Sequence, residues 1–202
     1  TVTGLDENIF FQEGITAGKD SQGFPNTIDH TGSKGAAWFP GTATTTGTSS
    51  YIDLGKDIEI EGDFMVMFWF KVPNTSVNYL FGYGSNDYFT ISDEDSFLFK
   101  MGGTNEVIDL ESGTDIGVEQ WHHIAITRTG ASGTIKIYFD NVAQTTDTEE
   151  STETLKIRTL MRKSTASGNY GFGMIDEFFI YDNFDANTIS KNYKHGKSKH
   201  KN

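Results

Sequence analysis

The sequence predicts an all-β domain in which two antiparallel sheets pack face to face. Its 202 residues include 22 glycines but only 3 prolines, and short apolar runs alternate with Gly, Ser, Thr and Asn, as in short strands joined by turns. The 16 phenylalanines can fill a core between two such sheets. One sandwich domain can reach about 250 residues, so a single domain accounts for the length.

The expected strands follow one another along the chain. Up to residue 47, apolar clusters separated by turn residues predict edge strands and loops. Residues 51–55 predict a short strand and residues 64–72 a longer one. Both odd and even positions of this longer strand are apolar, so we expect it to be central and buried on both faces. Further strands are predicted at residues 79–83, 88–92, 97–101, 107–110, 121–127, 134–139 and 174–181.

A short helical turn is expected near the C-terminus. Asn183 or Asp185 can cap it, because short polar side chains accept hydrogen bonds from the first amides of a helix. We assign residues 1–193 to one sandwich domain and the Lys-rich residues 194–202 to a basic tail, which can contact a neighbouring protein subunit.

Several segments carry a resemblance to a known family. They are Ala36-Ala37-Trp38-Phe39 with Tyr51-Ile52-Asp53-Leu54, Asp63-Phe64-Met65-Val66-Met67-Phe68-Trp69-Phe70-Lys71, Gln120-Trp121-His122-His123-Ile124-Ala125, Ile137-Tyr138-Phe139-Asp140-Asn141, and Gly173-Met174-Ile175-Asp176-Glu177-Phe178-Phe179-Ile180-Tyr181. In this order they resemble the laminin G-like, concanavalin A-like lectin/glucanase superfamily, which implies a jelly-roll β-sandwich. Trp69 and Trp121 are expected to supply large apolar plates between the two sheets.

Composition limits the possible partners. The formal net charge of −12 and the isoelectric point near 4.7 disfavour nucleic-acid binding, because a phosphate backbone would be repelled. No cysteine is present for a disulfide, a zinc thiolate or a nucleophile. We expect no membrane insertion, since no run approaches the roughly 20 apolar residues that a membrane span needs. A chain that begins at Thr1 is compatible with processing from a longer, exported protein.

Two motifs contain residue types that are common in catalytic sites. Some members of the family are glycoside hydrolases with a Glu-x-Asp-x-Glu strand, which Asp57, Glu59 and Glu61 imitate with the acids exchanged. His122 and His123 are adjacent in a strand, so their side chains should point to opposite faces and cannot easily hold one metal ion. We therefore predict no catalytic residue.

Calcium is the metal that the resemblance implies. Relatives bind one calcium ion near the sandwich edge through an early Asp of the closing strand and oxygens of N-terminal loops, which here implies Asp176 and Asp29. In the alternative interpretation, both carboxylates bond backbone amides and hold loops together.

A sugar site is predicted around one hairpin. Stacking on pyranose rings needs exposed aromatic side chains, and amides and carboxylates bond the hydroxyls. The candidate residues are Tyr79, Tyr83, Asn86, Asp87 and Tyr88. Strand tyrosines are also common as half-buried scaffold, and that alternative stays open.

These observations favour a non-catalytic, lectin-like module that recognises a glycan or another surface polymer. Its expected place is extracellular or surface-exposed, on a cell or a virion. The alternative is a structural or appendage domain of a larger assembly, such as a virion surface or a fibre, and a glycoside hydrolase is the third hypothesis.

Overall fold

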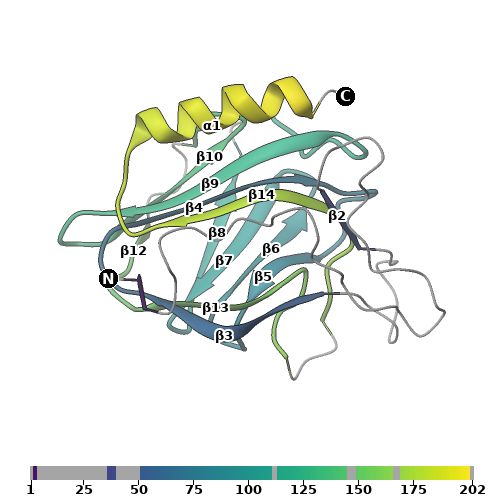
Figure 1. Cartoon of the computed structure of the whole chain (residues 1–202). Helices are drawn as coiled ribbons and strands as arrows, with labels where there is room; N and C mark the ends of the chain where they lie inside the picture. The colour runs from purple at the N-terminus through teal and green to yellow at the C-terminus, as the bar shows by residue number, and fades with distance from the viewer. Residues whose placement is uncertain are drawn as a thin grey trace.

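The computed structural model is a two-layer β-sandwich with one helix (Figure 1). It describes residues 2–3, 36–39, 51–110, 113–144, 149–165 and 169–200. Within these residues every strand pairing is antiparallel and each sheet has seven strands. The predicted all-β, two-sheet antiparallel jelly-roll sandwich is confirmed. No helix in the described part of the chain is long and apolar enough to cross a membrane.

The first sheet contains most of the hairpins that follow one another in the sequence. Its strands lie in the order β1 (Val2–Thr3), β3 (Ile52–Ile60), β13 (Leu155–Leu160), β5 (Asn78–Gly82), β6 (Tyr88–Asp93), β7 (Ser96–Met101) and β8 (Thr104–Asp109). Strand β13 therefore returns late in the chain to lie between β3 and β5. This insertion pairs Thr159 with Gly82 of β5.

The second sheet has the predicted central strand at its middle. Its order is β11 (Val142–Ala143), β10 (Thr134–Phe139), β9 (Trp121–Thr129), β4 (Phe64–Lys71), β14 (Gly173–Tyr181) and β2 (Ala37–Phe39), with β12 (Glu149–Glu150) also paired to β10. Every residue of β4 except Lys71 is buried. The expectation of a central strand buried on both faces is confirmed.

Phenylalanines fill the space between the sheets. Phe64, Val66, Phe68 and Phe70 of β4 belong to the core cluster that both sheets share. The Phe68 ring lies 5.4 Å from that of Phe178 in a stacked arrangement, with further aromatic rings around it. Aromatic pairs at such distances add attraction beyond the burial of their area.

The two tryptophans lie elsewhere than expected. Trp69 and Trp121 are not between the sheets: they form a separate cluster on the outer face of the second sheet, packed against Tyr193. Strand alternation explains the error, because Phe68 and Phe70 take the inward positions and Trp69 must then point outward. Outward apolar rings need a cover, and a helix supplies it.

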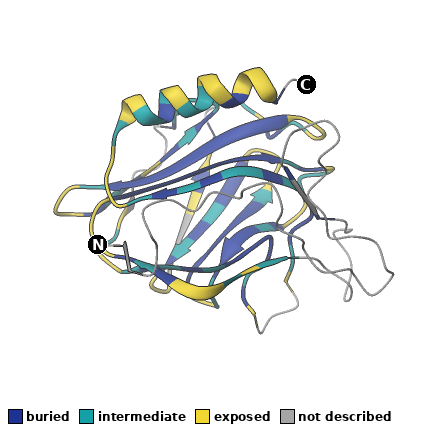
Figure 2. Ribbon diagram, viewed as in Figure 1, coloured by how far each residue is buried: buried dark blue, intermediate teal, exposed yellow. Residues whose placement is uncertain are grey.

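Helix α1 (Ala186–Lys199) lies across the outer face of the second sheet (Figures 1 and 2). Asp185 is the N-cap and accepts hydrogen bonds from the Asn187 amide at 2.9 Å and the Thr188 hydroxyl at 2.7 Å. The helix is longer than the expected turn and includes residues 194–199, for which the sequence predicts a basic tail. Packing of its underside against the tryptophans stabilises these extra turns.

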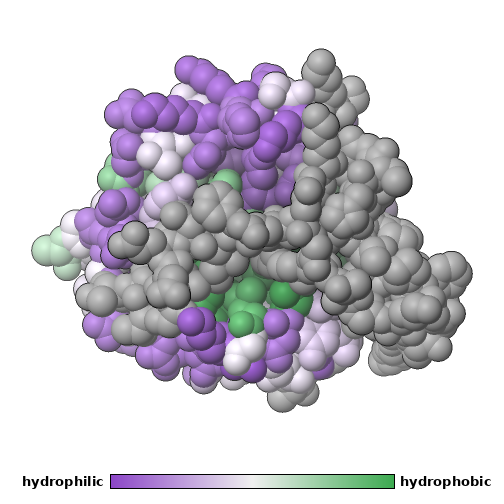
Figure 3. Space-filling model, in the orientation of Figure 1, coloured by the Kyte–Doolittle hydropathy of each residue, from purple (hydrophilic) through white to green (hydrophobic). Residues whose placement is uncertain are grey.

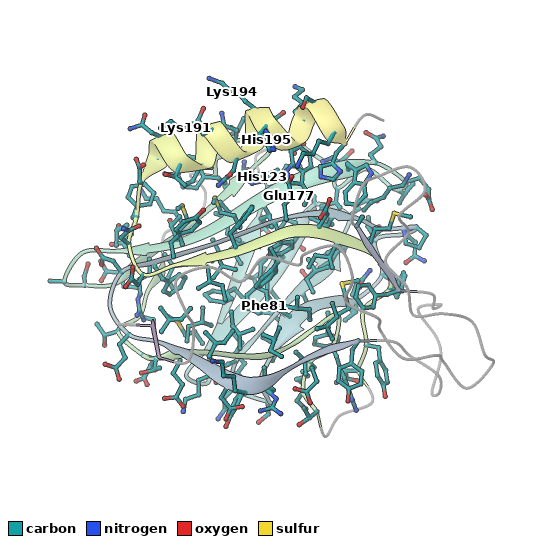
Figure 4. The ribbon with its side chains drawn as sticks, viewed as in Figure 1. Phe81, His123, Glu177, Lys191, Lys194 and His195 are labelled. Carbon is teal, nitrogen blue, oxygen red and sulfur yellow. The ribbon has the colours of Figure 1, made fainter. Side chains whose placement is uncertain are left out.

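Figure 2 shows that the outer side of α1 is exposed, whereas its buried residues, Ile189 and Gly196, face the sheet. Lys191 and Lys194 lie on this outer side, whereas His123 and Glu177 lie beneath the helix and Phe81 lies between the sheets (Figure 4). Hydrophilic residues cover the helix and the outside of the first sheet, and hydrophobic residues show between the two layers (Figure 3).

Candidate functional site

A pocket with a volume of about 460 Å³ lies at one end of the first sheet. Three separate segments form it: the turn after β5, the turn after β7 and the residues around the start of β13. Its lining residues, which we call the site pocket, are Tyr83, Gly84, Ser85, Asn86, Asp87, Gly102, Glu153, Thr154 and Lys156. Three of the five predicted sugar-binding residues, Tyr83, Asn86 and Asp87, are therefore brought together.

Backbone hydrogen bonds hold the first two segments against each other. The Tyr83 amide donates to the Asp87 carbonyl at 2.9 Å, which closes the turn after β5. The Gly103 amide donates to the Asn86 carbonyl at 3.0 Å, and the Gly102 amide donates to Asp87 Oδ1 at 3.1 Å. The floor of the pocket is thus fixed before any ligand arrives.

The Asp87 side chain is buried and supports the pocket from within. It is only 4% exposed, and burial raises the pKa of its carboxyl, although hydrogen bonds from the amides of Gly102 and Lys156 act in the opposite direction. A carboxylate that accepts backbone N–H bonds is a common turn support. The structure gives Asp87 a role in holding the turn that carries Tyr83 and Asn86.

The accessible wall of the pocket combines an aromatic ring with polar groups. Tyr83 is half-buried, and Asn86 and Glu153 are exposed. Lys156 Nζ lies 5.7 Å from the Tyr83 ring centroid and 2.9 Å from a carboxylate oxygen of Glu59. A ring, an amide, carboxylates and an ammonium group together offer a stacking surface and both donors and acceptors for hydroxyl groups.

Tyr79 and Tyr88 lie beside the pocket and not in its lining. Their rings contact each other at 5.6 Å, and Lys163 Nζ lies 5.6 Å from the first ring and 4.5 Å from the second. Burial raises the pKa values of both phenols. Tyr88 is only 7% exposed, while Tyr79 is half-buried. The five predicted residues thus form two adjoining groups.

Sequence reasoning missed the part of the site that comes from the distant segment. Glu153, Thr154 and Lys156 belong to or adjoin a Thr- and Glu-rich stretch that resembles a solvated loop, and β13 was not predicted at all. The alternation of apolar Leu155 and Ile157 with charged Lys156 and Arg158 was the available signal in the sequence.

The acids that imitate a hydrolase motif are engaged in ion pairs. Asp57 lies 3.2 Å from an Arg158 nitrogen, and Glu59 pairs with Lys156 on the outside of the first sheet. Pairing of two of the acids with cations fits a structural role better than a poised acid and nucleophile.

The two adjacent histidines point to opposite faces, as predicted. His122 stacks on Phe139 at 4.8 Å and lies with Nδ1 2.8 Å from Asp140 Oδ2. The His123 ring instead lies 5.3 Å from that of Trp69, beneath α1. No single ion can contact both imidazoles in this arrangement.

Of the two residues predicted to bind calcium, Asp176 is among the described residues and Asp29 lies outside them. Asp176 lies beneath the end of α1 with Oδ2 3.4 Å from His200 Nε2, and burial raises the pKa of its carboxyl to about 6. Among the residues that the structure describes, no group of three His, Cys, Asp or Glu can hold a metal ion. The described surroundings of Asp176 do not by themselves fit calcium, which needs several oxygen ligands.

Comparison with known proteins places the chain among lectin-like sandwiches. A family model described as the concanavalin A-like lectin/glucanases superfamily matches residues 46–184. No match was found among curated proteins.

Three solved structures illustrate the similarity of the fold. The native heptameric SAP-like pentraxin from Limulus polyphemus is 13% identical, with a TM-score of 0.54 over 77% of this chain and 79% of that one. The Ruminococcus gnavus IT-sialidase CBM40, solved with α2,3 sialyllactose, is 12% identical, with a TM-score of 0.55 over 78% and 97%. Mouse laminin α1 domains LG4-5 are 14% identical, with a TM-score of 0.52 over 71% and 40%.

Proposed function

The chain belongs to the concanavalin A-like lectin/glucanases superfamily, and from this premise we propose that it is a non-catalytic module that binds carbohydrate in the site pocket. The observation that carries the proposal is the convergence of a half-buried tyrosine with exposed polar groups in one preformed hollow. The CBM40 domain of similar fold was solved with a bound sialylated sugar, which supports the same class of ligand. An extracellular or surface location belongs to this proposal.

Each part of the pocket has a distinct task in this proposal. The Tyr83 ring stacks on the C–H face of a pyranose, and Asn86 and Glu153 bond its hydroxyl groups. Lys156 is held by Glu59, so its ammonium group loses little freedom when a hydroxyl binds. Asp87 keeps the turn in place through its bond to the Gly102 amide.

The non-catalytic part of the proposal is supported by the ion pairs of the hydrolase-like acids. A retaining glycosidase needs two carboxyl groups about 5 Å apart, one of them able to keep a proton. Asp57 and Glu59 are instead engaged in ion pairs with Arg158 and Lys156 on the outside of the first sheet. Release of reducing ends from a polysaccharide would revive the hydrolase hypothesis.

The test is binding to a glycan array, followed by titration calorimetry with the best ligand. We expect Tyr83→Ala and Asn86→Ala to weaken binding about tenfold or more, since each removes a direct contact. Phe184→Ala is the matched control, because Phe184 is an exposed aromatic residue that contacts Tyr138, away from the site pocket.

Absence of binding to every glycan, or unchanged affinity in Tyr83→Ala, contradicts the proposal. The array should be run with calcium and with a chelator. We also propose a calcium site that includes Asp176 and Asp29, the latter outside the described residues. Loss of glycan binding in the chelator would support this site.

A further inference from the structure

The outer face of the first sheet continues from the site pocket onto a group of tyrosines and lysines. Gly82, which precedes Tyr83, pairs across the strands with Tyr88, and Tyr88 pairs with Lys100 on its other side. Residues directly opposite in antiparallel strands point to the same face. Neighbouring Phe89 and Phe99 belong to the inner core, so Tyr88 and Lys100 point outward.

Lys163 lies over the rings of both Tyr88 and Tyr79. Its Nζ lies 4.5 Å from the Tyr88 ring centroid and 5.6 Å from that of Tyr79. We call Tyr79, Tyr88, Lys100 and Lys163 the tyrosine–lysine patch. It therefore places the Lys163 ammonium group over an aromatic pair, and Lys100 lies across the strands from Tyr88, immediately next to the site pocket.

The backbone fixes the place of Lys163. Its amide donates to the Asn169 carbonyl at 2.9 Å. A Cβ atom on Gly82 would lie only 2.1 Å from the Lys163 carbonyl oxygen, so this close approach to β5 requires glycine. Thr159 Oγ1 bonds the carbonyls of both Gly82 and Arg162, which ties the segment down further. The ammonium group thus extends from a rigid base.

The charge of the patch differs from that of the neighbouring surface. Lys156 and Arg158, on the same side of the sheet, pair with the carboxylates of Glu59, Asp53 and Asp57. Lys100 and Lys163 show no ion pair with the described part of the chain. In a protein with 28 acidic and 16 basic residues, two neighbouring lysines that pair with no acid of the described residues form a local positive site.

We propose that the carbohydrate ligand is acidic, and that the tyrosine–lysine patch binds its carboxylate or sulfate group while the site pocket holds the adjoining sugar. This inference rests on the proposed function and deepens it. The ammonium groups supply charge-assisted hydrogen bonds to the anion. The half-buried Tyr79 ring offers a face to the sugar that carries it.

The experiment compares three oligosaccharides of equal length by titration calorimetry with the whole chain: an oligogalacturonate, a sulfated galactan and a neutral galactan. We expect an acidic ligand to bind about tenfold more tightly than the neutral one at low salt, with the advantage shrinking in 0.5 M NaCl as the charges are screened. Whichever acidic ligand binds more tightly identifies carboxylate or sulfate as the preferred anion.

Lys163→Gln and Lys100→Gln should each remove most of this advantage and leave neutral-galactan binding unchanged. Lys197→Gln is the matched control, because Lys197 also lies over a tyrosine ring, 5.2 Å from that of Tyr193, but on α1. It should leave every affinity unchanged.

Equal affinity for acidic and neutral ligands, with Tyr83→Ala still weakening both, overturns this inference and leaves the proposed function standing. No binding of any of the three, combined with an empty glycan array, overturns both. If Lys197→Gln reduces the preference for acidic ligands as much as Lys163→Gln does, the role of the patch is also contradicted.

Discussion

The outer faces of the two sheets differ in what covers them. The outer face of the second sheet carries Met65, Met67 and Trp69, and α1 lies across it. The outer face of the first sheet carries tyrosines, lysines and ion pairs, and no described helix covers it. The same alternation of strand residues thus produces a buried face in one layer and an accessible face in the other. The accessible face is the one that can bind a ligand.

The covered face is a dense aromatic cluster. Trp69 stacks on Tyr193 with ring centroids 5.6 Å apart and planes within 8°. The His200 imidazole lies between two indoles, 4.8 Å from Trp69 and 4.4 Å from Trp121. A covered face of this kind stabilises the fold because it removes large apolar areas from water.

The open face obtains little stability from its contacts. Exposed ion pairs such as Lys156 with Glu59 contribute about 0 to 1 kcal/mol each. Side chains there can therefore change with little effect on folding. This difference between the faces separates residues that maintain the structure from residues available for binding.

The largest effect that tests this comparison is expected from Trp69→Ala. Truncating a buried tryptophan costs about 3–5 kcal/mol of unfolding free energy. Tyr79→Ala, the matched change on the open face, should cost on the order of 1 kcal/mol, since Tyr79 is only half-buried. Chemical denaturation followed by circular dichroism measures both. Equal losses would show that the two faces contribute alike.

Acidification should weaken the covered face by a smaller amount. Burial lowers the pKa values of His123 and His200 to about 4, whereas the unfolded chain binds these protons near pH 6.5. Their contribution to stability is therefore complete above pH 6.5 and is lost as the pH falls toward 4.

Asp176 opposes this trend. Burial raises the pKa of its carboxyl from 3.8 to about 6, so the cost of its charge is present above pH 6 and disappears as the pH falls toward 3.8. Glu177 and Lys199, which pair beside it, add opposite charges near His200. Two histidines outweigh one carboxyl, and we expect a net loss of roughly 2 kcal/mol between pH 7 and pH 5.

Denaturation curves across this range measure the loss. His123→Gln and His200→Gln, which remove the titrating groups, should each flatten the dependence on pH. A stability that rises between pH 7 and pH 5 would contradict the assignment of the dominant groups.

Much of the fold could be predicted from the sequence because its causes are local. Both the odd- and the even-numbered residues of 64–70 are apolar, which predicted that β4 is central. The position of Asp185 predicted that it caps the helix. The side of the second sheet on which Trp69 and Trp121 lie could not be predicted in this way. Both the odd- and the even-numbered residues of β4 are apolar. Which of the two sets points to the core depends on the sheet that packs against the strand.

The candidate site was predicted only where it is continuous in sequence. Tyr83, Asn86 and Asp87 come from one turn, and the structure brings them together. Glu153 and Lys156 join them because β13 inserts between β3 and β5, which is a long-range pairing without a local signal. The separation of Tyr79 and Tyr88 from the pocket likewise follows from strand alternation and the irregular register of β5 with β6.

The smallest predicted effect concerns the contact between α1 and the covered face. In an exposed helix, Gly→Ala stabilises by up to about 1 kcal/mol. At Gly196, however, a Cβ atom would lie 2.0 Å from Trp69 Nε1, and such overpacking costs about 1–3 kcal/mol. Gly196→Ala should therefore destabilise by on the order of 1 kcal/mol. In a Trp69→Ala background the indole is gone, and the same change should become stabilising, a reversal of sign that a double-mutant cycle detects. If the sign does not reverse, direct packing of the helix on Trp69 does not determine how closely α1 approaches the sheet.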